Sequence, residues 1–161
     1  MDAGTGTRVR GLRQDVDLVC HRFEAAVGFY RDGLGLPVVT QWAGVVRLDG
    51  GRGRWLTLWR ADPVADAQHV PAGRHSGASF AVDDLARLYR LLAGAGLRFA
   101  SAPCRQPWGA VMVNLVDPEG RLVTLVQHRG GLRDWPVAPV AVDTMANMEV
   151  TRESRPLSAA R

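Results

Sequence analysis

The sequence has no lysine and no isoleucine, and it has only two cysteines, Cys20 and Cys104, in 161 residues. Two cysteines are too few for a disulfide scaffold or a four-cysteine zinc site, and we expect reduced thiols in a cytoplasmic protein. No apolar run approaches the roughly 18 residues of a membrane-spanning helix. The first 14 residues contain arginines and lack the apolar stretch of a secretory signal peptide. The sequence therefore predicts a soluble protein with no membrane partner.

Positive charge is in moderate excess, with 20 basic residues against 16 acidic ones and a formal net charge of +4. The basic residues are all arginine, and they are spread along the chain rather than gathered into one segment. Nucleic-acid binding requires a clustered positive surface, so we expect no nucleic-acid partner. A diffuse positive field favours a neutral or anionic small ligand over a cationic one.

The first half of the chain predicts a β-α-β-β-β unit. Residues 15–20 alternate polar and apolar, as a half-buried strand does. Residues 23–31 carry an apolar helical face, and Gly33 and Gly35 end that helix. Three further strands with glycine-rich turns between them are predicted at 36–41, 44–48 and 54–59.

The second half repeats this pattern after a linker at 61–74 that is rich in Pro, Asp and Gly. We predict a strand at 77–82 and then a helix that Asp83 or Asp84 caps. The remaining strands are predicted at 97–100, 110–116 and 121–127.

Two pairs of matching segments indicate an internal repeat. FYRDGLGL at 29–36 matches LYRLLAGAGL at 88–97, and GRWLTLW at 53–59 matches GRLVTLV at 120–126. One four-stranded sheet with a single helix leaves an apolar face uncovered, and pairing two such sheets would bury it. The predicted fold class is therefore α+β, with two βαβββ modules, 14–60 and 75–128, that form paired curved sheets around a cleft.

The ends of the chain fall outside this repeat. Residues 1–13 lack periodicity and predict a flexible N-terminal arm. In the C-terminal arm, 129–161, the stretch 135–150 is too apolar for a wholly disordered end. We expect it to lie extended against the core or a partner subunit, with Trp135 closing one end of the cleft. A disordered end is the alternative.

The repeat and its motifs resemble the vicinal oxygen chelate superfamily, which includes glyoxalase I, extradiol dioxygenases, fosfomycin-resistance enzymes and bleomycin-resistance proteins. Besides FYRDGLGL, the resemblance rests on VDDL at 82–85 and DPEGRLVTLVQ at 117–127. The Pro-Trp-Gly sequence at 107–109 resembles the bleomycin-resistance branch in particular. The resemblance covers roughly residues 14–128 and implies paired βαβββ modules, often completed in a homodimer.

The resemblance also implies where a metal would bind. Metal-dependent members take ligands, usually His or Gln and Glu, from the first and last strands of each module. The matching positions here are Asp15, Thr57, Gly77 and Thr124. Two threonines and a glycine do not supply the carboxylates or imidazoles that a divalent cation needs. We therefore expect no metal and no cofactor.

His75 and Asp15 are the candidate catalytic residues. His75 precedes Gly77 by two positions, so a register shift of two would put its side chain on the same strand face. It would then act as a ligand or as a general base together with Asp15 or Asp17. The alternative is an ordinary surface histidine beside a linker. The two cysteines have no nearby histidine in the sequence, and we expect them to be inert thiols.

The tryptophans are the stronger indication of a binding site. Trp55 and Trp59 share a predicted strand face with Thr57, and Trp42 lies on the neighbouring hairpin. Flat aromatic surfaces there would stack a planar ligand; alternatively, some of them fill the interface between sheets. The predicted ligand-binding residues are Trp42, Trp55, Thr57, Trp59, Trp108 and Thr124. The candidates for anchoring an anionic group are Arg47, Arg54 and Arg121, although arginines at strand ends are usually solvated.

These observations favour a metal-independent small-molecule-binding protein, with antibiotic sequestration and self-resistance as one role. Known bleomycin sequesterers bind a cationic drug, so the basic charge here points to a neutral or acidic aromatic metabolite. The alternative is an enzyme on the same scaffold, a lyase, isomerase, cyclase or dioxygenase. A metal-free enzyme would use Asp15 or His75 as general base, since desolvation brings a carboxylate pKa toward neutrality. A third reading is a structural or regulatory module that binds a partner protein.

Open sheet edges predict the assembly. Eight short strands in two sheets leave unpaired edges, which proteins usually pair or cover. Two-fold assembly is the commonest solution, and we expect a homodimer.

Overall fold

The computed structural model describes residue 9, residues 11–62 and residues 73–128. The predictions for the arm at 135–150 and for Trp135 lie outside the described residues, as does most of the linker.

The first module is a βαβββ unit with a four-stranded sheet in the order β1-β4-β3-β2. Strand β1 runs parallel to β4, whereas β3 is antiparallel to both β4 and β2. A short α-helix continues directly into a π-helical segment, η1. The elements are β1 (Val16–Cys20), α1 (Phe23–Val27), η1 (Gly28–Gly33), β2 (Val38–Trp42), β3 (Val45–Gly51) and β4 (Arg54–Arg60).

The second module repeats this topology in a sheet with the order β5-β8-β7-β6. Strands β5 and β8 are parallel and the other pairs are antiparallel. The elements are β5 (His75–Ala81), α2 (Leu85–Gly94), β6 (Cys104–Arg105), β7 (Val111–Val116) and β8 (Leu122–Gln127). The predicted α+β class with two βαβββ modules is therefore confirmed.

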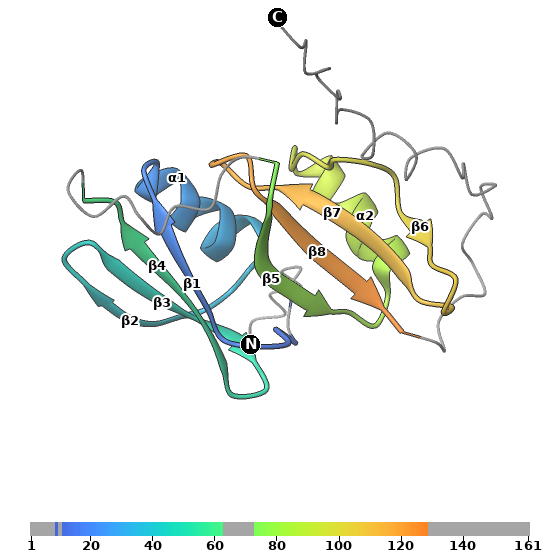
Figure 1. The fold of residues 1–161 in the computed structure, drawn as a ribbon, viewed down its shortest axis with the longest axis horizontal. Coiled ribbons are helices and arrows are strands. Elements are labelled where there is room, and N and C mark those ends of the chain that lie inside the picture. Colours follow the sequence, from blue (N-terminus) through green and yellow to red (C-terminus); the bar gives the residue numbers. More distant parts are fainter. Residues whose placement is uncertain (1–8, 10, 63–72, 129–161) are drawn as a thin grey trace, which may run out of the picture.

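The two sheets meet edge to edge (Figure 1), with β1 and β5 in contact. A Cβ added to Gly77 on β5 would lie 3.9 Å from the Val16 side chain on β1. Each sheet has a helix on one face, and Figure 1 shows both helices on the same side of the molecule. We call the other face of each sheet its open face. Because the sheets lie beside each other, the described part of one chain leaves them unclosed and does not enclose the predicted cleft.

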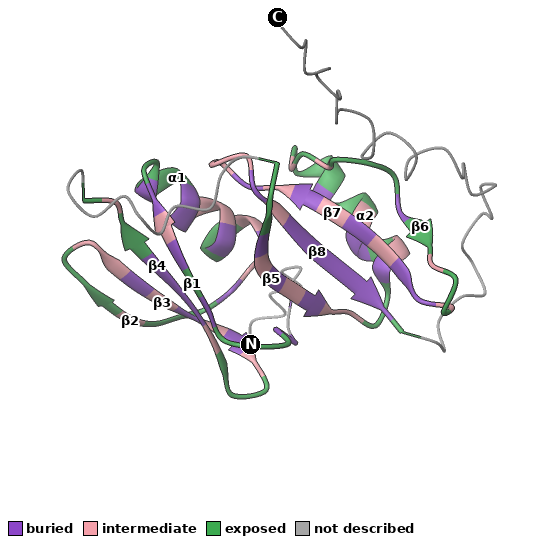
Figure 2. Cartoon of the chain, viewed as in Figure 1, coloured by how far each residue is buried: buried purple, intermediate pink, exposed green. Residues whose placement is uncertain are grey.

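Alternation along the strands separates core from open face. Leu56 and Leu58 of β4 are fully buried with the helices, and Trp55, Thr57 and Trp59 point the other way. Figure 2 shows buried residues along β8 and exposed ones on the outer strands β2 and β6. In α2 the buried stripe consists of Leu85, Leu88 and Leu92.

Asp84 caps α2, as its position predicts, because its carboxylate accepts a hydrogen bond of 2.9 Å from the Arg87 amide. The strand predicted at 97–100 is wrong in extent. Phe99 makes only an isolated bridge to Leu115, and the regular sixth strand is β6 at 104–105. Pro103 lies between them and lacks the N–H that ladder pairing requires.

The interpretation of 1–13 as a flexible arm is wrong for its last residues. Val9 and Leu12 are buried, and Leu12 bridges Phe80 of β5. The amides of Gly11 and Leu12 both donate to the Gly50 carbonyl at 2.8 Å. A Cβ on Gly50 would lie only 2.5 Å from the Leu12 Cβ, so this close approach requires glycine. Gly11 and Leu12 therefore lie between the modules, because they contact Gly50 of the first and Phe80 of the second.

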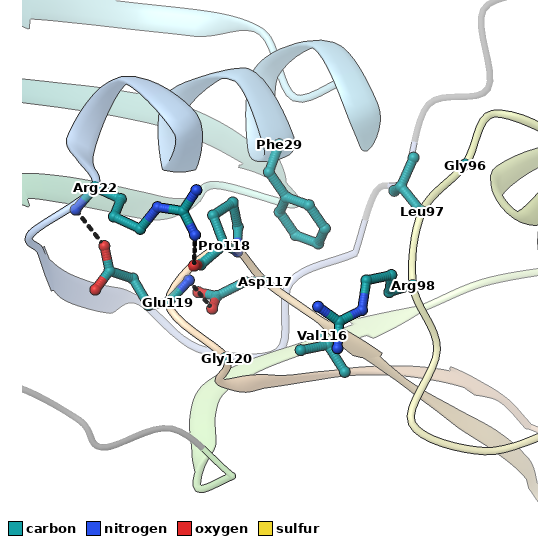
Figure 3. A pocket seen from close by; sticks show the side chains of 10 residues that line it. All are labelled: Arg22, Phe29, Gly96, Leu97, Arg98, Val116, Asp117, Pro118, Glu119 and Gly120. Atoms are coloured by element: carbon teal, nitrogen blue, oxygen red, sulfur yellow. Dashed lines mark hydrogen bonds between the residues drawn. The ribbon is translucent and has the colours of Figure 1, made fainter.

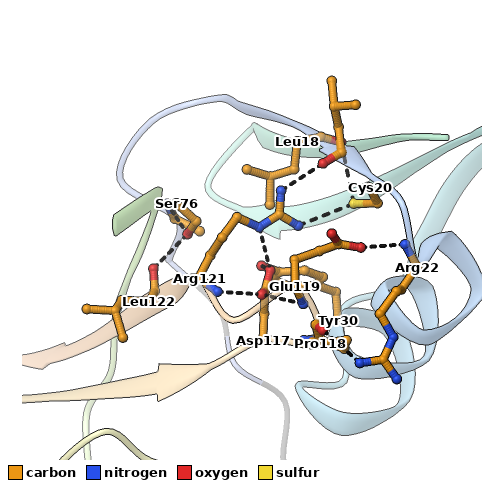
Figure 4. Close-up of polar contacts among 12 residues, drawn as sticks. Leu18, Cys20, Arg22, Tyr30, Ser76, Asp117, Pro118, Glu119, Arg121 and Leu122 are labelled. Atoms are coloured by element: carbon orange, nitrogen blue, oxygen red, sulfur yellow. Dashed lines mark hydrogen bonds and ion pairs between the residues drawn. The ribbon is translucent and has the colours of Figure 1, made fainter. Parts of the chain in front are cut away.

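A buried ion pair joins the modules (Figure 4). Arg121 of the β7–β8 turn is fully buried, and its Nε donates to Asp117 Oδ2 at 2.8 Å. Its Nη1 donates to the Val19 carbonyl of β1 at 2.9 Å, and its Nη2 lies 3.3 Å from Cys20 Sγ. The turn of the second module is thus fixed to the end of the first strand.

Tyr30 of η1 completes this cluster from the helix side, since its hydroxyl donates to Asp117 Oδ2 at 3.0 Å. Burial, with the Asp117 charge as a second cause, raises the pKa of Tyr30 well above its ordinary value. Burial also raises the pKa of the Cys20 thiol, consistent with the expectation of an inert thiol. Tyr30 therefore stays a neutral donor, which keeps the Asp117 carboxylate paired on two sides.

We predict that replacing Arg121 with methionine destabilises the protein by about 3–5 kcal/mol, because it leaves the Asp117 charge buried without its partner. The matched control is Arg90→Met on the exposed face of α2, which should leave the free energy of unfolding nearly unchanged. Urea unfolding measures both. An equal, small loss in the two variants would contradict the prediction.

Candidate functional site

The open face of the first sheet carries most of the predicted aromatic set. In the strand register Arg47 pairs with Thr57 and Trp59 pairs with Val45, while Trp42 pairs with Val45 from the other side. Trp42 is 54% exposed and Trp59 is 43% exposed. This face therefore presents two accessible indoles on either side of one strand.

Two aspartates, Asp15 just before β1 and Asp17 within it, form hydrogen bonds with β4 on this aromatic face. Asp17 Oδ1 accepts a 3.1 Å hydrogen bond from Trp59 Nε1, which orients the indole. Asp15 Oδ1 accepts a 2.9 Å bond from the Trp55 amide. Asp15 was a candidate general base, and the structure places it as an acceptor for β4 instead. No hydrogen bond among the described residues joins Asp15 to His75.

The open face of the second sheet carries a chain of three polar side chains. His75 Nδ1 accepts from the Gly77 amide at 2.9 Å, so the neutral ring carries its proton on Nε2. Nε2 then donates to Thr124 Oγ1 at 2.6 Å, and Thr124 donates to Asn114 Oδ1, also at 2.6 Å. The predicted shift of His75 onto this face occurs, because β5 changes register between His75 and Ser79.

Burial lowers the pKa of His75, so the imidazole is neutral at neutral pH. Both ring nitrogens are occupied, and the proton points from His75 toward Thr124. Thr124 is thus a hydrogen-bond acceptor from His75 and is not activated as a nucleophile. This arrangement positions polar groups rather than supplying a free base.

The positions that the resemblance assigns to metal ligands do not form a metal site. Thr57 and Thr124 are buried, and Gly77 has a φ of +86° that suits glycine. Within the described ranges there is no group of three or more His, Cys, Asp or Glu side chains that could hold a metal ion. The donor set at these positions does not fit a divalent cation.

One chain divides the predicted binding residues between two surfaces. Trp42, Trp55, Thr57 and Trp59 lie on the first sheet, while Thr124 and Trp108 belong to the second. Trp108 is 62% exposed on the turn between β6 and β7. The outer strands β2 and β6 lie at opposite ends of the molecule (Figure 1). Trp42 ends β2, whereas Trp108 follows β6.

The three candidate arginines have different roles. Arg121 as an anion anchor is wrong, because its guanidinium is buried in the ion pair with Asp117. Arg54 is exposed at the start of β4. Arg47 lies on the open face of the first sheet beside Thr57.

A separate hollow of about 420 Å³ lies beside η1 and the loop after α2 (Figure 3). It was not predicted from the sequence, since it brings together segments that are far apart in the chain, among them the DPEG turn at 117–120. Its polar groups mostly contact one another: Arg22 Nη1 donates to the Pro118 carbonyl, and the Arg22 amide donates to Glu119. It is lined by Arg22, Phe29, Gly96, Leu97, Arg98, Val116, Asp117, Pro118, Glu119 and Gly120. None of the predicted binding residues is among them.

Comparison with known proteins identifies the family. The model of the Glyoxalase/Bleomycin resistance protein/Dioxygenase superfamily matches residues 14–125. The chain belongs to this superfamily. Among its members, a bleomycin resistance protein from Klebsiella pneumoniae is 33% identical over 113 residues, which are 66% of this chain and 84% of that protein.

Two solved structures of the superfamily carry different functional names. A bleomycin resistance determinant encoded on transposon Tn5 is 28% identical, with a TM-score of 0.54 over 73% of this chain and 98% of that one. Lactoylglutathione lyase from Agrobacterium tumefaciens is 26% identical, with a TM-score of 0.56 over 76% of this chain and 96% of that one. The superfamily therefore fixes the fold and leaves binding or catalysis to the residues of the site. In the described part of the chain, no helix has the length and apolarity to span a membrane.

We predict that His75 makes stability depend on pH. Its lowered pKa means that the folded state binds fewer protons than the unfolded state. The stabilising contribution is present above the unfolded pKa of about 6.5 and is lost as pH falls through the folded value. His75→Asn should therefore lose less stability than the wild type between pH 7.5 and pH 5, measured by urea unfolding. His128→Asn, at an exposed position, is the control; a His75→Asn profile parallel to the wild type would refute the role.

Proposed function

We propose that this protein binds a small planar molecule, neutral or anionic, between the aromatic face of its first sheet and a second sheet, without a metal. The observation that carries the proposal is the pair of exposed indoles, Trp42 and Trp59, beside Thr57 on the open face. Large exposed aromatics grouped on one face are typical of a binding surface. Sequestration of an antibiotic is one role for such binding, supported by the 33% identity to a bleomycin resistance protein.

The hydrogen bonding of the site supports binding over catalysis. Asp17 fixes the indole of Trp59, and a fixed ring loses little entropy when a ligand stacks on it. His75 and Thr124 are engaged with each other and with Asn114, so their protons are already committed. Such groups suit the recognition of a ligand's polar edge better than the transfer of a proton.

An enzyme on the same fold is the alternative, and the structural likeness to lactoylglutathione lyase favours it. His75 would be its most suitable residue, because its pKa is lowered and it lies next to Thr124. Elemental analysis of the purified protein tests for a metal-bound form of such an enzyme. Stoichiometric Zn, Fe, Mn or Ni would favour the enzyme and count against metal-free binding.

Ligand titration tests the proposal. We expect at least one compound in a panel of planar aromatic natural products to quench tryptophan fluorescence with saturation. Calorimetry with that compound should show about tenfold weaker binding, roughly 1.4 kcal/mol, for Trp59→Ala and for Trp42→Ala, because each removes a stacking surface.

The control for this titration is Leu91→Ala, which removes a 46% exposed apolar side chain on α2, away from the open face. Its affinity should equal that of the wild type. Absence of quenching across the whole panel, or full affinity in both tryptophan variants, would overturn the proposal.

We infer further that two copies complete the site. In a two-fold pair, the first sheet of one chain can face the second sheet of the other, which brings Trp42 and Trp108 to one cleft. The exposed apolar residues of β2, Val38 and Val39, support this, because an unpaired apolar edge strand is normally covered.

Light scattering at micromolar concentration tests the pairing, and we expect twice the 17.5 kDa mass of the chain. Val39→Glu should shift the protein toward the single chain, since it puts a charge into the covered surface. A mass of one chain for the wild type would refute the dimer.

A further inference from the structure

Arg47 occupies the centre of the aromatic open face of the first sheet. It is the middle residue of β3 on this face, with Thr40 opposite it on β2 and Thr57 opposite it on β4. Trp42 lies one same-face position further along β2, and Trp55 and Trp59 lie one such position to either side of Thr57 on β4. Arg47 therefore lies between two threonines, with tryptophans at the neighbouring positions of the same face.

Arg47 is half-buried, and one nitrogen of its guanidinium lacks a hydrogen-bond partner among the described residues. Its Nε is buried and has no hydrogen-bond partner in the part of the chain that the structure describes. Buried N–H groups of charged side chains are nearly always paired, because an unmade hydrogen bond leaves the full desolvation cost. The fully buried Arg121 follows this rule, since its guanidinium pairs with Asp117.

Carboxylates border this face, but each is engaged by a neutral donor. Asp17 accepts from the Trp59 indole, and Asp15 accepts from the Trp55 amide. Asp49, on the same strand as Arg47, accepts from the Gly51 amide at 2.7 Å. Among the described residues none of the three forms an ion pair with Arg47. The face thus holds a guanidinium that makes no direct ion pair with a described residue, although carboxylates lie nearby.

We propose that Arg47 is the anion subsite of this face and that it receives the carboxylate of an aromatic acid whose ring stacks on Trp42 or Trp59. The identity of this subsite rests on the proposed function, because it assumes that a ligand lies on the open face. A carboxylate matches the planar fork formed by two N–H groups of a guanidinium, giving two parallel charge-assisted hydrogen bonds. Because Arg47 is partly exposed while its Nε is buried, the ligand would meet the terminal nitrogens of the guanidinium.

This subsite sets the charge of the ligand. A cationic group placed at Arg47 would be repelled by the guanidinium, whereas a neutral amide would accept a hydrogen bond from it but would bring no opposite charge. The preferred ligand class is therefore an aromatic acid rather than the cationic drug class that bleomycin sequesterers bind.

A matched pair of probes tests the proposal. 2-Naphthoate and 2-naphthamide have the same ring and nearly the same shape, and they differ in charge. Calorimetry on the full chain should show 2-naphthoate binding at least about tenfold tighter than the amide, with an advantage that shrinks as salt is added. Arg47→Met should reduce the preference to about twofold or less while the amide affinity stays within twofold of wild type. Arg47→Lys should retain part of the preference, because it keeps the charge and loses the fork.

Arg54→Met is the control, since Arg54 is an exposed arginine on the adjacent strand β4 and lies outside the proposed subsite. It should keep the full preference for 2-naphthoate. Equal binding of the two probes to the wild type, or an unchanged preference in Arg47→Met, would overturn the anion subsite while leaving aromatic binding in place. Failure of both probes to bind would count against the proposed function itself, and the subsite would be withdrawn with it.

Discussion

The buried ion pair between Arg121 and Asp117 is the constraint on which the arrangement of the two modules depends. Arg121 is fully buried and contacts β1, Cys20 and Asp117 at once. A buried guanidinium requires such partners: Asp117 and the Val19 carbonyl both accept hydrogen bonds from it. Asp117 also accepts a hydrogen bond from Tyr30. A shift of the β7–β8 turn relative to β1 or η1 would break hydrogen bonds that the buried Arg121 and Asp117 side chains make. The cluster therefore fixes how the second module sits against the first.

That fixed arrangement decides where binding is feasible. With β1 beside β5, both helices cover one side of the molecule and both open faces look the other way (Figure 1). The first open face is aromatic around Arg47, and the second is polar, built on His75 and Thr124. Under the proposed function, the first face would contact the ring of a planar ligand and the second its polar edge. The proposed second copy would bring the two faces together.

The fold was predictable from the sequence because the evidence for it is local and repeated. The matched motifs at 29–36 and 88–97, and at 53–59 and 120–126, predicted both modules, and alternation placed Trp55, Thr57 and Trp59 on one face. The sequence alone also shows that positions 57 and 124 are threonines rather than carboxylates. Sequence reasoning misjudged Arg121, because a strand-end arginine in sequence does not show that Asp117 and Val19 will surround it. It also misjudged Leu12, whose burial depends on the space beside Gly50.

The sequence by itself determined the elements, their repeat and the residue types available to the site, because strand alternation, helical periodicity and glycine turns act over a few residues. Only the tertiary structure decided which of those residues meet. It joined His75 to Thr124 through a register change in β5, engaged Asp15 in holding β4, and separated Trp42 from Trp108. Within the described residues it also left the Nε of Arg47 without a hydrogen-bond partner. These outcomes depend on strand order and on contacts between segments far apart in the chain, which no local pattern encodes.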